Sequence, residues 1–145
     1  MHPTAAKVQE RLRERGLEVE VVDLPDSTRT AAEAAEACGS ELGQIVKSLV
    51  FVVDGRPTMV LCAGDRRVTL VEGKPADAQQ ARDATGFSIG GIPPLGHDSE
   101  LPTIVDESLR RFERVWCAAG TPHAVFVVPT SDLLAALPDA SVQPV

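Results

Sequence analysis

The sequence predicts an α+β domain built around a mixed, mostly antiparallel sheet. Helical and strand-like segments alternate irregularly rather than as repeated strand–helix units. The strongest strand pattern, residues 45–53, is followed by Asp54-Gly55 and by a second apolar run over 58–63, which together are typical of a hairpin. The chain has 145 residues with no internal repeat or linker, so we expect one domain over residues 1–145.

The N-terminal segment predicts a helix over residues 4–15 and a strand over 17–23. Thr4 is a favourable N-cap and Gly16 a favourable C-terminal stop. Between them, apolar residues recur every three or four positions, which is typical of a helix with one buried face. Residues 17–23 alternate apolar and acidic side chains, which indicates a strand with one side in water.

Local signals also place the remaining elements. Thr30-Ala-Ala-Glu33 fits a capping box, and it predicts a helix that ends before Gly39. The other expected elements are a helix-tolerant segment over 72–84, strands over 101–105, 115–118 and 124–128, and short helices over 106–112 and 132–137. Residues 138–145 are expected to form a loose tail.

Composition narrows the function classes. The 21 acidic against 14 basic residues give a net charge of −7, which disfavours non-specific binding to nucleic acid, DNA included. No apolar run approaches the roughly 20 residues needed to cross a membrane. The N-terminus lacks the apolar core of a signal peptide, so a cytoplasmic protein is expected. The three cysteines form no CxxC pair and the three histidines are scattered, so we expect no disulfide framework, metal site or cofactor.

Lys47 is the first candidate functional residue. Within the strand 45–53 it shares a face with apolar side chains only, because side chains alternate along a strand. An unpaired buried ammonium costs several kcal/mol. The amine therefore reaches water at the strand end, pairs with a buried carboxylate, or lines a pocket whose ligand supplies negative charge. A two-residue turn would place Cys62 opposite Lys47 and a four-residue turn would place Gly64 there; both are small and favour the pocket.

The second candidate is the loop 86–97, which reads Gly-Phe-Ser-Ile-Gly-Gly-Ile-Pro-Pro-Leu-Gly-His. Glycine allows close approach to a ligand, and proline stiffens the chain. Such a loop suits a backbone site for a carboxylate, a phosphate or a developing oxyanion. The available donors are the N–H groups of Gly90, Gly91 and Ile92, since Pro93 and Pro94 have none. The alternative is a purely structural hairpin or crossover loop.

Three segments together resemble the YbaK/EbsC (ProX-like) family. They are residues 30–51 with Gln44-Ile-Val-Lys47, residues 85–97 with the Gly–Pro loop, and residues 115–134 with Val115-Trp-Cys-Ala-Ala-Gly. The resemblance covers about residues 28–137. It implies a mixed sheet curled into a partial barrel with flanking helices.

The resemblance also implies a function. The family includes free-standing trans-editing enzymes, which hydrolyse mischarged aminoacyl-tRNA, and the editing domain of bacterial prolyl-tRNA synthetases. It implies a metal-independent deacylase whose partners are the 3′ end of an aminoacyl-tRNA and a tRNA synthetase. Lys47 would be the essential lysine, on the ester carbonyl or the terminal phosphate, and the loop 90–94 would hold the ester. Two departures are Pro93, where many members have Ser, and the short polar segment 71–84.

The predicted site therefore has three parts. The catalytic residues are Lys47, Gly90 and Gly91. The substrate-binding residues are Ile92, Pro93, Pro94, Cys62, Gly64 and His97. The candidate tRNA contacts, for which a solvated surface is the alternative, are Arg66, Arg67, Arg110, Arg111 and Arg114. Two other functions stay open: a non-catalytic module that binds an aminoacyl-tRNA or a synthetase, and a thiol hydrolase using Cys62. The amino acid recognised is not determined by the sequence.

Overall fold

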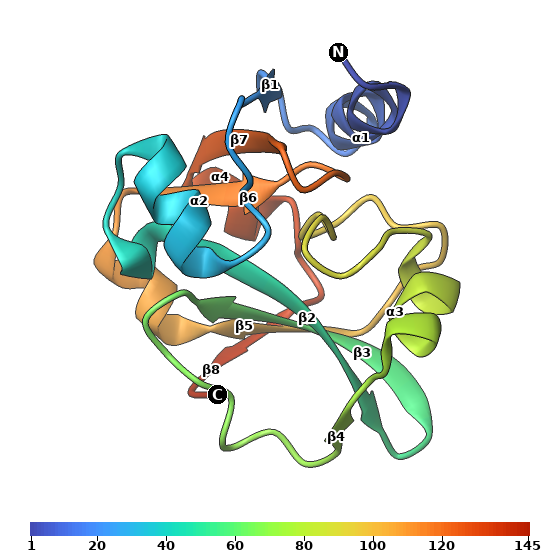
Figure 1. The fold of residues 1–145 in the computed structure, drawn as a ribbon. Coiled ribbons are helices and arrows are strands. Elements are labelled where there is room, and N and C mark those ends of the chain that lie inside the picture. The colour runs from blue at the N-terminus through green and yellow to red at the C-terminus, as the bar shows by residue number, and fades with distance from the viewer.

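The computed structural model describes all 145 residues and contains two β-sheets with flanking helices (Figure 1). The helices are α1 (Pro3–Glu14), α2 (Ala31–Cys38), α3 (Ala78–Thr85) and α4 (Thr130–Ala135), with 3-10 helices at Leu42–Gln44 and Glu107–Arg111. The strands are β1 (Val22–Asp23), β2 (Val46–Val53), β3 (Arg56–Ala63), β4 (Lys74–Pro75), β5 (Thr103–Asp106), β6 (Arg114–Ala118), β7 (Ala124–Pro129) and β8 (Ser141–Gln143).

The two sheets are separate but adjacent. Strands β1, β7 and β6 form the smaller sheet, and the larger has the order β4-β2-β3-β5-β8. A single parallel bridge between Ile45 and Trp116 connects them, so they do not form a closed barrel. Pairing is antiparallel except for β3 with β5 and β5 with β8. The predicted α+β class with a mixed, mostly antiparallel sheet is confirmed.

The β2–β3 hairpin follows the sequence prediction. Asp54 and Gly55 have φ values of +51° and +77°, the left-handed pair that a two-residue type I′ turn requires. The resulting register places Lys47 opposite Cys62. The four-residue alternative, which would have placed Gly64 there, is wrong.

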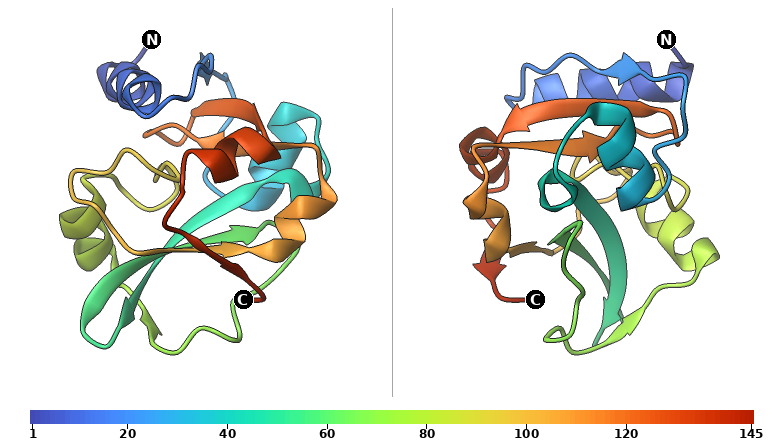
Figure 2. Two further views of the ribbon diagram at one scale, coloured as in Figure 1. Left: turned by 180° about the vertical axis from the view of Figure 1, so that it is seen from behind. Right: turned by 60° about the vertical axis from the view of Figure 1, so that its left-hand side comes forward.

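Apolar residues cover both faces of β2. On one face, Val46 and Val50 join the main core of 23 buried residues, to which α1 contributes. On the other, Phe51 packs with Val60, Cys62 and Val145 in a smaller cluster. Helix α1 lies over the smaller sheet, and α2 lies where the two sheets meet (Figure 2). The large sheet therefore separates two apolar layers, as the apolar pattern of residues 45–53 predicted.

Three segments differ from the prediction. Only Val22–Asp23 of the expected strand 17–23 pairs with β7, because the N–H of Val21 donates to the side chain of Gln9 at 2.7 Å instead. The first helix is capped by His2, whose ring accepts from the Thr4 N–H. The expected loose tail is wrong: β8 pairs with β5, and Val145 is only 6% exposed. None of the helices combines the length and the hydrophobicity that a membrane-spanning segment requires.

Candidate functional site

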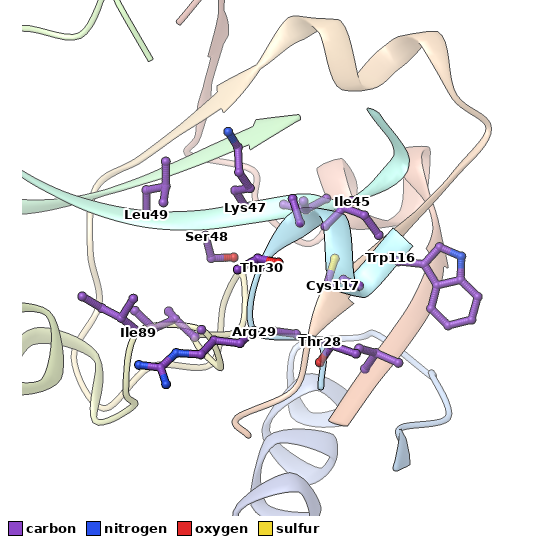
Figure 3. A pocket seen from close by; sticks show the side chains of 17 residues that line it. Thr28, Arg29, Thr30, Ile45, Lys47, Ser48, Leu49, Ile89, Trp116 and Cys117 are labelled. Carbon is purple, nitrogen blue, oxygen red and sulfur yellow. The ribbon is translucent and has the colours of Figure 1, made fainter. Parts of the chain in front are cut away.

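A cavity of about 310 Å³ lies at the junction of the two sheets (Figure 3). Four segments line it: the start of α2, the first half of β2, the Gly–Pro loop and the β6–β7 pair. The lining residues are Thr28–Ala31 and Ala34, Ile45–Leu49, Ile89, Gly90 and Ile92, and Trp116–Ala118 with Val125. Eleven of these 17 residues are hydrophobic, so the cavity offers a small apolar site with few polar groups.

The charge of the cavity is opposite to that of the protein. The chain carries a net charge of −7, yet no Asp or Glu lines the cavity. Its two charged lining residues are Arg29 and Lys47, both cations, and the Lys47 amine is bonded to the Arg66 carbonyl. The remaining cation, Arg29, favours a ligand that carries a negative charge.

The Gly–Pro loop contributes unpaired donors to the cavity. The N–H groups of Gly90 and Ile92 have no acceptor within the chain, although Ile92 is only 4% exposed. Gly90 has φ +93°, and a Cβ there would lie 2.6 Å from Cγ of Arg29, so glycine is required. Buried N–H groups are nearly always hydrogen-bonded, so the N–H of the buried Ile92 is available to a ligand, and the half-buried Gly90 offers a second free donor beside it.

Gly91 does not have the predicted role of a backbone donor to the substrate. Its N–H donates to the carbonyl of Ser88 at 3.0 Å, and its own carbonyl accepts from the N–H of Gly120 at 2.7 Å. A Cβ on Gly91 would lie 3.0 Å from the Gly120 backbone. The predicted donation from Gly91 to substrate is therefore replaced by a packing contact between the loop and the β6–β7 turn.

Ser48 is a polar group of the cavity that the sequence reasoning missed. Its hydroxyl oxygen is buried and has no hydrogen-bond partner. In Figure 3 the side chain points from β2 toward Thr30 and the cavity, on the opposite side from Lys47. The carbonyl of Val50 accepts from the N–H of Ala76 and therefore points away from β3. Backbone N–H and C=O groups point to the same edge of a strand at every second residue, so those of Ser48 also point to the edge of β2 away from β3.

The amine of Lys47 lies outside the cavity. The residue belongs to the lining, but Figure 3 shows its side chain leaving β2 on the far face, together with Leu49. There Nζ donates to the carbonyl of Arg66. The expectation that this amine faces the loop across the cavity is wrong for the observed side-chain conformation. The cause is that strand alternation assigns Ser48, not Lys47, to the cavity face.

The second half of the loop is structural. Pro93 and Pro94 are buried and lie outside the cavity lining. A ring nitrogen of His97, Nε2, lies 2.7 Å from the carbonyl of Pro93, and burial lowers the pKa of His97. A neutral imidazole therefore donates to the loop backbone. His97 therefore makes a structural contact within the loop rather than the predicted substrate contact.

Cys62 and Gly64 also lie outside the cavity. Cys62 is fully buried, and burial raises the pKa of its thiol to about 11, so it is not a thiolate at neutral pH. A Cβ on Gly64 would lie 2.3 Å from the carbonyl of Leu42, so this glycine serves close backbone packing. Cys117 lines the cavity, and complete burial raises the pKa of its thiol as well. These placements argue against the thiol hydrolase.

None of the five predicted tRNA-contact arginines lines the cavity: Arg66, Arg67, Arg110, Arg111 and Arg114. Arg111 donates twice to Asp65, at 2.9 and 2.7 Å, and these bonds lower the pKa of the Asp65 carboxyl. Nε of Arg66 lies 3.8 Å from the same carboxylate. Two of the five charges are thus compensated within the chain. No group of three or more His, Cys, Asp or Glu side chains is arranged to hold a metal ion.

Comparison with known proteins places this site in a family. Residues 25–136 match the model of the aminoacyl-tRNA editing domain. The uncharacterized protein YwhH of Bacillus subtilis is 31% identical over 127 residues, which are 80% of each chain. The proline--tRNA ligase of Acidithiobacillus ferrooxidans is 37% identical over 87 residues, which are 54% of this chain and only 15% of the ligase.

Solved structures agree with this assignment. A structure described as a putative trans-editing enzyme for prolyl tRNA synthetase has a TM-score of 0.90 and 45% identity, over 99% of this chain and 97% of the other. The hypothetical protein APE2540 has a TM-score of 0.85 and 27% identity, over 94% and 97% of the two chains. The resemblance read from the lysine and loop motifs is confirmed: this chain belongs to the aminoacyl-tRNA editing domain family.

Proposed function

We propose that this protein is a free-standing editing enzyme that hydrolyses the ester between a wrong amino acid and the 3′ end of a tRNA. The observation that carries the proposal is a mostly apolar cavity lined by two loop residues, Gly90 and Ile92, whose N–H groups have no acceptor in the chain. Membership of the editing family supplies the substrate class. The similarity to a trans-editing protein for prolyl tRNA synthetase favours mischarged proline tRNA as the substrate.

The chemistry follows from the donors. Water adds to the ester carbonyl carbon, and the carbonyl oxygen becomes a tetrahedral oxyanion. Collapse of this intermediate breaks the bond to the ribose oxygen, which takes up a proton, and releases the free amino acid. The N–H groups of Gly90 and Ile92 stabilise the oxyanion, and each such donor is worth roughly 10²–10³ in rate. Their backbone origin makes them preorganised.

The proton of the attacking water goes to the substrate. No carboxylate and no imidazole lines the cavity, and the thiol of Cys117 is held neutral by burial. The ribose hydroxyl next to the ester is the group we assign to relay this proton: it accepts the proton of the water and passes its own to the departing ribose oxygen. The reaction so written needs no metal ion, and treatment with a chelator is a control in every assay below.

Lys47 is the catalytic side chain of this proposal. Its amine must leave the Arg66 carbonyl and swing round the edge of β2 to reach the ester carbonyl. At residue 47 that edge has no partner strand, since β4 pairs only with Phe51 and Val52. The conformation described here is then the resting one, and substrate charge draws the amine across.

The test is a panel of mischarged tRNAs, including proline tRNA that carries small amino acids. Wild-type protein is expected to release at least one amino acid, and Lys47→Ala to lose this activity with an unchanged melting temperature. Lys74→Ala, which removes an exposed lysine on β4, is the matched control and should retain full activity. If pure wild-type protein leaves every tRNA of the panel intact, the enzyme proposal fails.

One observation favours a second candidate, a non-catalytic module for an aminoacyl-tRNA or its synthetase. The cavity offers no protein group to act as a base, so it is also suited to binding alone. Such a module would bind a non-hydrolysable aminoacyl-adenosine, co-purify with a synthetase, and show no turnover. Hydrolysis of any tRNA of the panel at a rate that Lys47→Ala abolishes would exclude it.

A further inference from the structure

Arg29 is a cation at the cavity mouth without a partner in the chain. Its guanidinium takes part in no salt bridge, and its side chain makes no hydrogen bond. The other lining cation, Lys47, is bonded to the Arg66 carbonyl. Arg82, on α3 near the loop, donates to the Ser88 hydroxyl at 2.7 Å. Arg29 therefore carries the one free positive charge that lines the cavity.

The side chain of Arg29 packs on the loop. A Cβ built on Gly90 would lie only 2.6 Å from Cγ of Arg29, so the aliphatic stem of Arg29 lies directly against the Gly90 backbone. Figure 3 shows the guanidinium extending along the loop on the same side as Ile89, beyond the apolar part of the cavity. Ile89 is 49% exposed there. The mouth thus combines a free cation with an exposed apolar side chain, next to a donor assigned to the oxyanion.

A free cation beside an exposed apolar side chain suits the terminal nucleotide of the substrate, which is the part that lies next to the ester. An aminoacyl ester is joined to a ribose, and that ribose carries a base and a 5′-phosphate. A guanidinium binds a phosphate through two parallel hydrogen bonds, and the phosphate is the anionic group of this end of the substrate. Resting on the proposed function, we propose that Arg29 binds the 5′-phosphate of the terminal nucleotide and thereby positions the ester against Gly90.

Binding of two small analogues tests this directly. The probes are 3′-deoxy-3′-(L-alanylamino)adenosine, whose amide resists hydrolysis, and the same compound with a 5′-phosphate. Wild-type protein is expected to bind the phosphorylated compound about tenfold more tightly, and this advantage should shrink as salt is raised. In Arg29→Met, which keeps an unbranched stem over Gly90, the advantage should disappear while binding of the unphosphorylated compound is unchanged.

Matched variants sharpen the result. Arg56→Ala removes an exposed arginine on the hairpin, remote from the cavity lining, and should keep the tenfold advantage. Arg29→Lys keeps the positive charge but lacks the two parallel N–H donors of a guanidinium, so it should keep only part of the tenfold advantage. Equal affinity of wild type for both compounds, or an equal loss for both in Arg29→Met, would overturn the phosphate assignment alone. If neither compound binds to the wild type, the acyl site fails and the assignment fails with it.

Discussion

The two faces of strand β2 treat their polar groups in opposite ways. On the far face, the amine of Lys47 is bonded to the Arg66 carbonyl, and the thiol of Cys62 lies 3.5 Å from the same oxygen. On the cavity face, the hydroxyl of Ser48 has no partner, and the N–H groups of Gly90 and Ile92 across the cavity have none either. Lys47 and Ser48 are adjacent in the sequence, yet the polar group of Lys47 is hydrogen-bonded within the chain and that of Ser48 is not.

The difference separates stability from function in this fold. A polar group that is buried without a partner destabilises the folded protein by about 1–3 kcal/mol. Ser48 and Ile92 are two such groups, and Gly90 is half-buried beside them; their free hydrogen-bonding groups around one cavity are best explained if a ligand completes the bonds. Apart from Lys47, whose amine we propose moves to the substrate, the far face is expected to contribute to stability alone, and there Val145 packs in the small apolar cluster.

After the loss of activity expected for Lys47→Ala, the largest effect is expected from Gly90→Ala. The new methyl group would meet Arg29 at 2.6 Å and strain a backbone with φ +93°, so the loop would shift and misplace its donor. Deacylation should fall about 100-fold, the value of one oxyanion donor. Gly16→Ala is the matched control: its φ is +87°, but a Cβ there meets nothing within 4 Å. Both should lose about 1 kcal/mol of stability from the backbone strain, and only Gly90→Ala should lose activity.

A smaller effect, on stability alone, is expected from removing residues 141–145. This deletion abolishes the β5–β8 pairing, the burial of Val145 and the bond from the Thr69 N–H to the Val145 carbonyl at 2.6 Å. Unfolding in urea should show a loss of about 2 kcal/mol, from burial of one valine and its hydrogen bonds. The deacylation rate at 25 °C should be that of the wild type. A lower rate in the folded protein would extend the functional region to the far face.

The smallest effect, and the sharpest, is expected from two serine variants. Ser48 and Ser108 both have buried hydroxyls without a partner, but only Ser48 lines the cavity. Replacement by alanine should leave stability unchanged or raise it by about 1 kcal/mol in both cases. Only Ser48→Ala should reduce kcat/KM, by about tenfold. Equal activities of the two variants would show that the free Ser48 hydroxyl has no part in substrate binding.

Sequence reasoning was strongest where local chemistry decides the structure. Asp54-Gly55 admits few turns other than a tight one, so the pairing of Lys47 with Cys62 could be anticipated. The strand at 141–143 could not, since it is short and pairs in parallel with β5, which is distant in the sequence. Pairing of that kind leaves no local signal.

The candidate site was predicted in part. Gly90 and Ile92 line the cavity as expected, because glycine and proline restrict the loop whatever surrounds it. The orientation of Lys47 was not accessible, since both faces of β2 are apolar and either could have been the cavity face. Arg29 stands alone before a helix cap and belongs to no motif, so only its place beside Gly90 reveals it.

The joint between Gly91 and Gly120 has a consequence for selectivity. Because a 2.7 Å hydrogen bond joins the loop to the β6–β7 turn with no side chain between them, we expect these two walls of the cavity to keep a fixed separation. Discrimination among amino acids would then be steric: an amino-acid side chain that is too bulky is excluded by contact, because the cavity does not widen to admit it. Fidelity would then depend on the rigidity of the cavity, and a change that weakened the contact between Gly91 and Gly120 would broaden the range of amino acids removed from tRNA.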